Sequence, residues 1–164
     1  LLPYGEAKEV CASLQNGRKD KLEKLLSYKD DTAGGLMTTE FISARPDWTV
    51  EQVIQEIKSK SDSFRSILYI YVTDKDGVYK GVVSLRRLLT AQPADKIINV
   101  MKKSKRLPCA RPHQPVREFG KLMTKYDLNS VAVIDHKHRL LGIVTVDDVM
   151  RKFFSHGVKF FLCR

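Results

Sequence analysis

An internal duplication is the feature that most constrains how this chain can fold. Residues 81–89 and residues 142–150 share one order of residue types: a glycine, two β-branched apolar residues, a hydroxyl residue and an apolar helix start. Residues 36–37 correspond in the same way to residues 100–101. A duplication of this length marks a repeated supersecondary unit. The sequence therefore predicts two similar units, roughly over residues 36–89 and 100–150.

The first unit has the pattern of a helix, a hairpin and a second helix. Thr49 and Gln52 form a capping box ahead of the first helix, and Ser84 is the expected cap of the second. Residues 66–73 are rich in β-branched and aromatic residues and predict a strand, with a turn before a second strand at residues 82–83. The apolar helix positions expected to face a core are Val50, Val53, Ile54, Ile57, Leu85, Leu88 and Leu89.

The second unit repeats this order. Strands are expected over residues 131–134 and 141–144, and Thr145 is the expected cap of the last helix. The helix before these strands should bury Val116, Phe119, Met123 and Tyr126. One unit alone is small for a stable core, so the two should pack sheet to sheet. The predicted fold class is therefore α+β, with tandem β-α-β-β-α repeats related by a pseudo-twofold axis and preceded by short helices.

Charge and composition narrow the function classes. The formal net charge of +10 fits attraction to phosphate groups, and it fits a plain solvated basic surface equally well. No aromatic residues interleave the densest basic run, residues 102–106, so a specific nucleic-acid interface is not favoured. The longest runs without a charged residue are about eight residues, too short to cross a bilayer. The three cysteines are far apart in the sequence, which indicates reduced thiols rather than a disulfide framework. The sequence contains no motif of a catalytic triad or a phosphate-binding loop.

The repeated unit resembles the CBS domain, which works as a tandem pair that binds adenine nucleotides and reports them to an attached enzyme or channel. Residues 25–38 carry a Thr-Ala-Gly-Gly-Leu-Met junction that resembles the one between the helical N domain and the CBS pair of MgtE-type magnesium transporters. Residues 69–72, 81–86 and 142–149 agree with the same family. This resemblance implies the end of a helical N-type domain at residues 1–30, CBS repeats at residues 31–92 and 93–152, and a tail or helix toward a membrane domain at residues 153–164.

The resemblance also implies a function and partners. In that family the cytosolic region is a homodimer that binds Mg2+ on acidic faces and closes the pore, and ATP between the repeats tunes the response. We therefore expect the cytoplasmic regulatory domain of a membrane-anchored magnesium transporter, with no enzymatic activity of its own. The expected partners are a second copy, the transmembrane domain of the parent transporter, and ATP or AMP.

For the nucleotide, the resemblance points to the cleft between the repeats. Tyr69 matches a tyrosine that packs on adenine, Leu128 falls where an apolar residue closes the same slot, and Arg86 matches an arginine suited to phosphate. Arg87 departs from the family, which usually places an aspartate there to accept from ribose hydroxyls, and arginine cannot accept. The complete set of candidate binding residues is Tyr69, Ser84, Arg86, Arg87, Leu128, Thr145 and Asp148. The two hydroxyl residues are equally well explained as helix caps.

For the metal, Asp127 and Asp148 match family acidic positions, and both fit equally well as surface carboxylates or caps. Neutral or basic residues stand at other matching positions, namely Pro115, Arg117, Arg151, His156 and Lys159. Mg2+ prefers carboxylate oxygens, so the sensor sites are depleted. Two other hypotheses remain open: a freestanding CBS-pair protein regulated by adenine nucleotides, and a basic adaptor for nucleic acid or a membrane surface.

Overall fold

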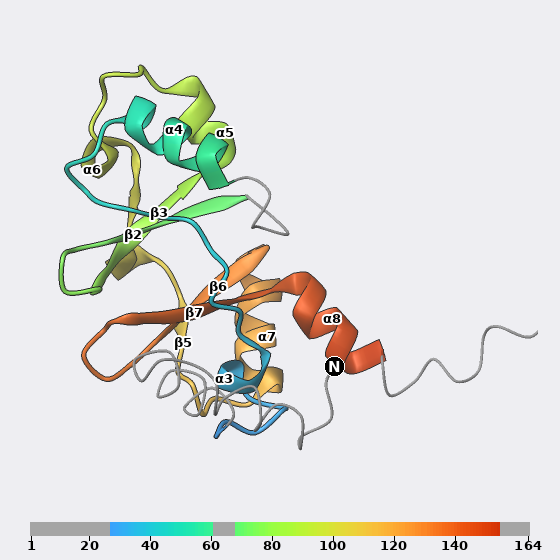
Figure 1. Cartoon of the computed structure of the whole chain (residues 1–164). Helices are drawn as coiled ribbons and strands as arrows, with labels where there is room; N and C mark the ends of the chain where they lie inside the picture. The colour runs from blue at the N-terminus through green and yellow to red at the C-terminus, as the bar shows by residue number, and fades with distance from the viewer. Residues whose placement is uncertain (1–26, 61–67, 155–164) are drawn as a thin grey trace, which may run out of the picture.

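The computed structural model describes residues 27–60 and 68–154, and these residues form two similar halves (Figure 1). In the first half, a sheet of order β1-β2-β3-β4 is covered by helices α4, α5 and α6. In the second, a sheet of order β5-β6-β7 is covered by α3, α7 and α8. The strands are β1 (Ser43–Ala44), β2 (Tyr69–Thr73), β3 (Tyr79–Ser84), β4 (Lys102–Lys103), β5 (Cys109–Ala110), β6 (Ser130–Ile134) and β7 (Leu140–Thr145). The helices are α3 (Ala33–Leu36), α4 (Val50–Lys60), α5 (Leu85–Thr90), α6 (Ile97–Val100), the 3-10 turn η2 (Ser104–Arg106), α7 (Val116–Lys125) and α8 (Val146–Phe154).

The two hairpins have the same register. Tyr69 pairs with Ser84 in the first hairpin, and Ser130 pairs with Thr145 in the second. Each hairpin also shifts register once, near the end of its first strand. Each half buries its own apolar cluster beneath its helices, and a third cluster lies between the two sheets. The predicted α+β architecture of two packed repeats is therefore confirmed.

The halves exchange their first segments, which the sequence did not predict. Helix α3 begins the first repeat in sequence but packs with the second half, where Ala33 N donates to Gln114 O at 2.9 Å. Helix α6 packs with the first half, where Ile97 N donates to Trp48 O at 2.9 Å (Figure 1). The boundary expected between residues 92 and 93 thus divides the two repeats in sequence, but each structural half also contains a segment from the other repeat.

Two glycines at equivalent positions permit this exchange. A Cβ on Gly81 would lie 2.2 Å from the carbonyl oxygen of Lys102, and one on Gly142 would lie 2.7 Å from that of Thr38. In both places the backbone of an exchanged segment crosses the strand too closely for any side chain. The repeated glycines at positions 81 and 142 are therefore required where the exchanged segments cross the strands.

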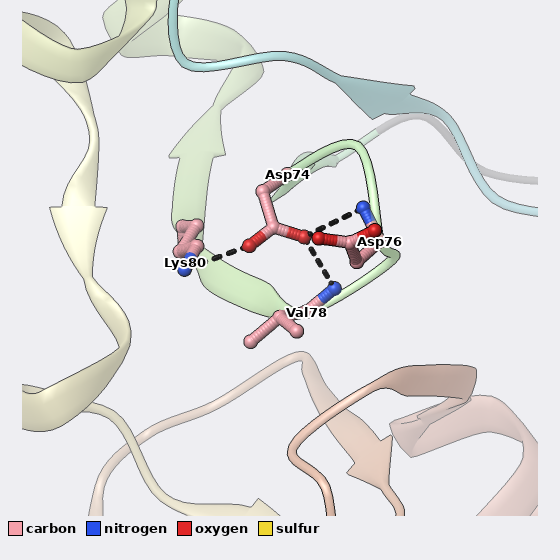
Figure 2. Close-up of polar contacts among 4 residues, drawn as sticks. All are labelled: Asp74, Asp76, Val78 and Lys80. Atoms are coloured by element: carbon pink, nitrogen blue, oxygen red, sulfur yellow. Dashed lines mark hydrogen bonds and ion pairs between the residues drawn. The ribbon is translucent and has the colours of Figure 1, made fainter.

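Asp74 organises the turn of the first hairpin (Figure 2). One carboxylate oxygen accepts from the backbone amides of Asp76 and Val78, and the other lies 2.8 Å from Lys80 Nζ. The ion pair with Lys80, together with the amide of Val78, lowers the pKa of Asp74 from its usual value. The two hairpin turns also join each other, since Tyr79 N donates to His138 O at 2.9 Å.

Two residues expected to face the core are exposed instead. Leu89 is 65% exposed on α5, because that short helix buries Leu88 and turns its neighbour outward. Tyr126 is 51% exposed, because α7 ends before it and the chain leaves the helical path there. The interpretations of residues 1–26 and 155–164 lie outside the described residues.

Candidate functional site

The cleft between the two sheets holds an apolar slot built from both halves. Tyr69 of β2 and Val82 of β3 supply one wall, and Leu128 and Ala132 supply another. Because the slot draws on both sheets, only the packed pair of repeats can form it. Its lining comprises Tyr69, Tyr71, Tyr79, Val82, Lys102, Leu107, Pro108, Tyr126, Asp127, Leu128, Ser130 and Ala132.

A hydrogen bond between the halves joins two residues that line this slot. Tyr71 Oη lies 2.6 Å from Ser130 Oγ, and the tyrosine side chain is almost fully buried. Burial raises the pKa of Tyr71 to about 12, although the bond to Ser130 acts in the opposite direction. The phenol therefore stays neutral at physiological pH and acts as a structural contact.

A basic pocket adjoins the slot, because five residues line both. Its volume is about 710 Å³, within the range of roughly 300–1,000 Å³ typical of small-molecule sites. Three cationic side chains reach it: Arg87 from α5, and Lys102 and Lys103 from β4. Its complete lining is Arg87, Met101, Lys102, Lys103, Leu107, Pro108, Tyr126 and Leu128. This pocket suits an anionic group attached to a ring held in the slot.

An acidic pocket occupies the equivalent place in the other half. It is lined by Thr38, Glu40, Ile143, Thr145, Asp147, Asp148 and Arg151. Within it, Asp148 Oδ2 accepts from the Thr145 hydroxyl at 2.6 Å and from the Thr145 backbone amide at 3.1 Å. Thr145 Oγ1 in turn accepts from the amide of Asp148 at 3.3 Å. These two candidate residues thus form a reciprocal cap at the start of α8.

The first half keeps only part of that cap. Ser84 Oγ accepts from the backbone amide of Arg87 at 3.2 Å, as expected for a helix cap. The guanidinium of Arg87 lines the basic pocket, where an aspartate would have completed the cap. Ser84 and Arg86 line neither the apolar slot nor the basic or acidic pocket. Of the adjacent residues Arg86 and Arg87, only Arg87 lines the basic pocket, and Arg87 is the one that departs from the family pattern.

The two candidate metal ligands lie in different pockets. Asp127 lines the apolar slot and Asp148 lines the acidic pocket. Asp127 has a positive φ of 50°, which places it in the left-handed region just after α7. Within residues 27–60 and 68–154, no group of three or more histidine, cysteine, aspartate or glutamate side chains is arranged to hold a metal ion. Arg151 lines the pocket of Asp148, which adds a positive charge where a cation would bind.

The sequence interpretation missed several lining residues. Lys102 and Lys103 were read as part of a basic run, and Leu107 and Pro108 were not singled out. Lys102 follows Met101 as Thr38 follows Met37, so the repeat alignment contained a signal for the place of Lys102. The alignment could not show that Lys102 and Lys103, which begin the second repeat, pair with β3 of the first sheet.

The fold and cleft define a class of protein: tandem β-α-β-β-α repeats that exchange their first segments and enclose a ligand-sized crevice. The profile of the CBS domain family matches residues 33–94 and again residues 97–155. The chain belongs to this family and is a CBS domain pair that matches the cytosolic region of MgtE magnesium transporters.

Relatives and solved structures agree on this match. The magnesium transporter MgtE of Thermus thermophilus is 39% identical over 79% of this chain and 28% of its own length. The MgtE of Bacillus subtilis is 30% identical over 85% of this chain and 30% of its own length. The crystal structure of the cytosolic domain of the Mg2+ channel MgtE in complex with ATP has a TM-score of 0.80 and 36% identity, covering 88% of this chain and 58% of that one.

A crystal structure of the soluble part of a magnesium transporter has a TM-score of 0.83 and 29% identity, covering 95% of this chain and 60% of that one. The chain thus spans less than a third of the length of the MgtE proteins from Thermus thermophilus and Bacillus subtilis. In the part that the structure describes, no helix has the length and hydrophobicity needed to cross a membrane.

Proposed function

We propose that this CBS pair is the cytoplasmic regulatory domain of a magnesium transporter and that it responds to an adenine nucleotide, to Mg2+ or to both. The observation that carries the proposal is the apolar slot beside the basic pocket, because this combination fits a base attached to phosphates. The match to the cytosolic region of MgtE, including a structure in complex with ATP, supports the same assignment.

In the proposed complex, the adenine of ATP or AMP packs against Tyr69 and is enclosed by Leu128. Asp127 lines the same slot, and its carboxylate makes no hydrogen bond within the described residues, so it can accept from ribose hydroxyls. The phosphates then extend toward Lys102 and Arg87. Arg86, Ser84, Thr145 and Asp148 contribute less directly, through the helix starts on either side of the cleft.

The Mg2+ response rests on fewer residues. Asp127 and Asp148 remain as candidate ligands, and each would bind Mg2+ with retained waters rather than in a closed cage. Arg117 and Arg151 stand where the family resemblance implies acidic residues, so the repulsion that Mg2+ would relieve is smaller. We therefore propose that nucleotide is the stronger of the two signals.

We propose that the role of this chain is regulatory rather than catalytic. Burial raises the pKa of the Cys109 thiol, which makes it a poor nucleophile at neutral pH. The proposed partners are a second copy of the chain and the transmembrane domain of a parent transporter. Four apolar side chains of α8 suit such contacts, because they are at least 37% exposed: Val146, Met150, Phe153 and Phe154.

The test is a pair of titrations on the 164-residue chain, one with ATP and one with MgCl2, followed by melting temperature and by mass in solution. A ligand that prefers the folded state raises the melting temperature, by an amount that grows with its concentration. Replacing the corresponding region of the Thermus thermophilus transporter with this chain then tests regulation through Mg2+ uptake.

Loss of ATP-dependent control in that chimera, with ATP binding retained by the isolated chain, would favour a freestanding nucleotide-sensing CBS protein. No response to either ligand would contradict the proposal. Binding to duplex DNA or to anionic vesicles that falls steeply with salt would instead support the basic adaptor.

A further inference from the structure

The entry segment, residues 28–35, docks on the second half of the fold before the chain forms any part of the first (Figure 1). Three backbone bonds join it to the residues that lead into α7: from Ala33 N to Gln114 O at 2.9 Å, from Gly34 N to Pro112 O at 2.8 Å, and from Val116 N to Asp31 O at 2.8 Å. Donors lie on both sides of this contact, and Ala33 is fully buried in the apolar cluster of the second half. The entry segment is therefore fixed to the second half.

Tyr28 packs against both sides of this contact. Its ring lies on the backbone of Gly34, because a Cβ added to that glycine would be 2.4 Å from Tyr28 Cγ. The same ring meets the imidazole of His113 edge to face, with ring centroids 5.2 Å apart and an angle of 65° between the ring planes. Gly34 belongs to the entry segment and His113 to the residues that lead into α7, so Tyr28 holds the two together.

Thr32 gives the entry segment a compact shape. Its Oγ1 donates to Lys29 O at 2.7 Å and accepts from Gly35 N at 3.4 Å. Thr32 is 7% exposed, so water competes little for these bonds. The entry segment is therefore held by its own residues as well as by the second half.

Helix α7 connects the entry segment to the cleft. It begins at Val116, whose amide bonds the entry segment, and ends at Lys125, shortly before Asp127 and Leu128 of the apolar slot. Leu128 and Ala33 also pack on the same apolar cluster. The entry segment and one wall of the slot thus belong to one packed body, whereas the opposite wall comes from the first half.

We propose that the entry segment is a coupling clamp, which makes the chain that precedes residue 28 move with the second half, and that Tyr28 is its positioning residue. A ligand in the slot touches both halves, so it favours one position of the second half relative to the first, and the clamp passes that position to the preceding chain. The use of the clamp in regulation rests on the proposed function, whereas the clamp itself does not.

Amide hydrogen exchange of the unliganded 164-residue chain tests the clamp. Tyr28→Ala should speed exchange of the Gly34 and Val116 amides about tenfold, because loss of the ring contacts favours local opening. Amides of β2 and β3 in the first half should change less than about twofold. Tyr28→Phe keeps the ring and should keep the protection. Unchanged exchange at Gly34 and Val116 in Tyr28→Ala, or equal acceleration in both halves, would overturn the clamp.

Gln92→Ala is the matched control. Gln92 is the equivalent of Tyr28 when residues 36–37 are aligned with residues 100–101, and it is exposed. This variant should leave exchange at Gly34 unchanged. Gly34→Ala is an independent second variant, because its Cβ would displace the Tyr28 ring and should produce the same local acceleration.

The chimera with the Thermus thermophilus transporter tests the regulatory use of the clamp. Tyr28→Ala in the chimera should weaken the dependence of Mg2+ uptake on ATP about fivefold or more, while the affinity of the isolated chain for ATP changes less than about twofold. A purely structural role would lower both together. Unchanged control of uptake in that variant would overturn the coupling. Failure of the parent chain to bind ATP or Mg2+ would refute the proposed function, and amide exchange would still decide whether the clamp exists.

Discussion

Arg87 of α5 and Asp148 of α8 hold the same position in their helices, and only Asp148 completes a reciprocal cap. Its carboxylate accepts from both the amide and the hydroxyl of Thr145. In the first half, Ser84 Oγ accepts from the Arg87 amide, but the Arg87 side chain has no oxygen that could accept from Ser84 in return. The start of α5 is therefore less completely capped than the start of α8, and the residue responsible, Arg87, lines the basic pocket.

The first prediction is that Arg87→Asp stabilises the unliganded chain. The new carboxylate can reach back to Ser84 and complete the cap, which should contribute about 0.5–1 kcal/mol to the free energy of unfolding. Urea denaturation measures this change. The reverse substitution, Asp148→Arg, should cost about 1 kcal/mol because it removes the second half of an existing cap. A loss of stability in Arg87→Asp would contradict the view that Arg87 is retained for ligand binding.

The features predicted correctly from sequence are those set by local chemistry. The bonds from Thr49 N to Gln52 Oε1 at 2.9 Å and from Gln52 N to Thr49 Oγ1 at 3.2 Å form the capping box that the sequence indicated. Ser84 accepts the helix amide expected of a cap. Residues 36–37 and 100–101 end equivalent short helices, as their alignment suggested. Each of these depends on neighbours within a few positions.

The features that sequence could not supply are those set by distant segments. Whether α6 packs on its own repeat or on the other one depends on contacts between residues about 50 positions apart, which local patterning does not encode. Which of the two candidates Arg86 and Arg87 lines a pocket has the same origin, because neighbouring helix residues point about 100° apart and only the packed structure brings Arg87 into the lining of the basic pocket.

The second prediction concerns the glycines where the exchanged segments cross. Gly81→Ala should cost about 3 kcal/mol, because its Cβ would lie 2.2 Å from a backbone oxygen that cannot move without disturbing β4. Gly142→Ala should cost about 1–2 kcal/mol, since a flexible methionine side chain forms part of the contact and only one backbone oxygen is close.

Gly120→Ala is the matched control for this pair. Gly120 lies within α7, and nothing stands within 4 Å of a Cβ there, so alanine should stabilise the chain by about 0.5–1 kcal/mol. Unfolding free energies of the three variants measured in urea test the ranking. If Gly81→Ala were neutral, the close crossing of Lys102 over β3 would be wrong.

The third prediction concerns the bond between the two sheets. Ser130→Ala leaves the buried phenol of Tyr71 without a partner and should cost about 1–3 kcal/mol, while Tyr71→Phe leaves a half-buried hydroxyl on Ser130 and should cost about 0.5–1 kcal/mol. The double variant should lose less than the sum of the two. A coupling energy of about 1 kcal/mol from the double-mutant cycle would identify a bond between these two side chains, and additive losses would exclude it.

The fourth prediction is a pH dependence at the first hairpin turn. The pKa of Asp74 is held below its usual value by the ion pair with Lys80 and by the amide of Val78, so the folded state favours the charged carboxylate. A lowered folded-state pKa means that this contribution to stability is present above the unfolded pKa, near 3.9, and is lost as the pH falls through the folded value. Asp74→Asn should therefore lower the melting temperature at pH 7, and the gap to the parent chain should close as the pH falls below about 4.

Lys80→Met separates the two causes of that shift, because it removes the ion pair and leaves the amide bonds to Asp74 in place. In this variant the acid transition should move to higher pH, and its stability at pH 7 should depend less on NaCl than that of the parent chain, since the screened interaction is gone. A gap between Asp74→Asn and the parent chain that persists unchanged through the acid transition would assign the effect to the shape of the turn rather than to charge.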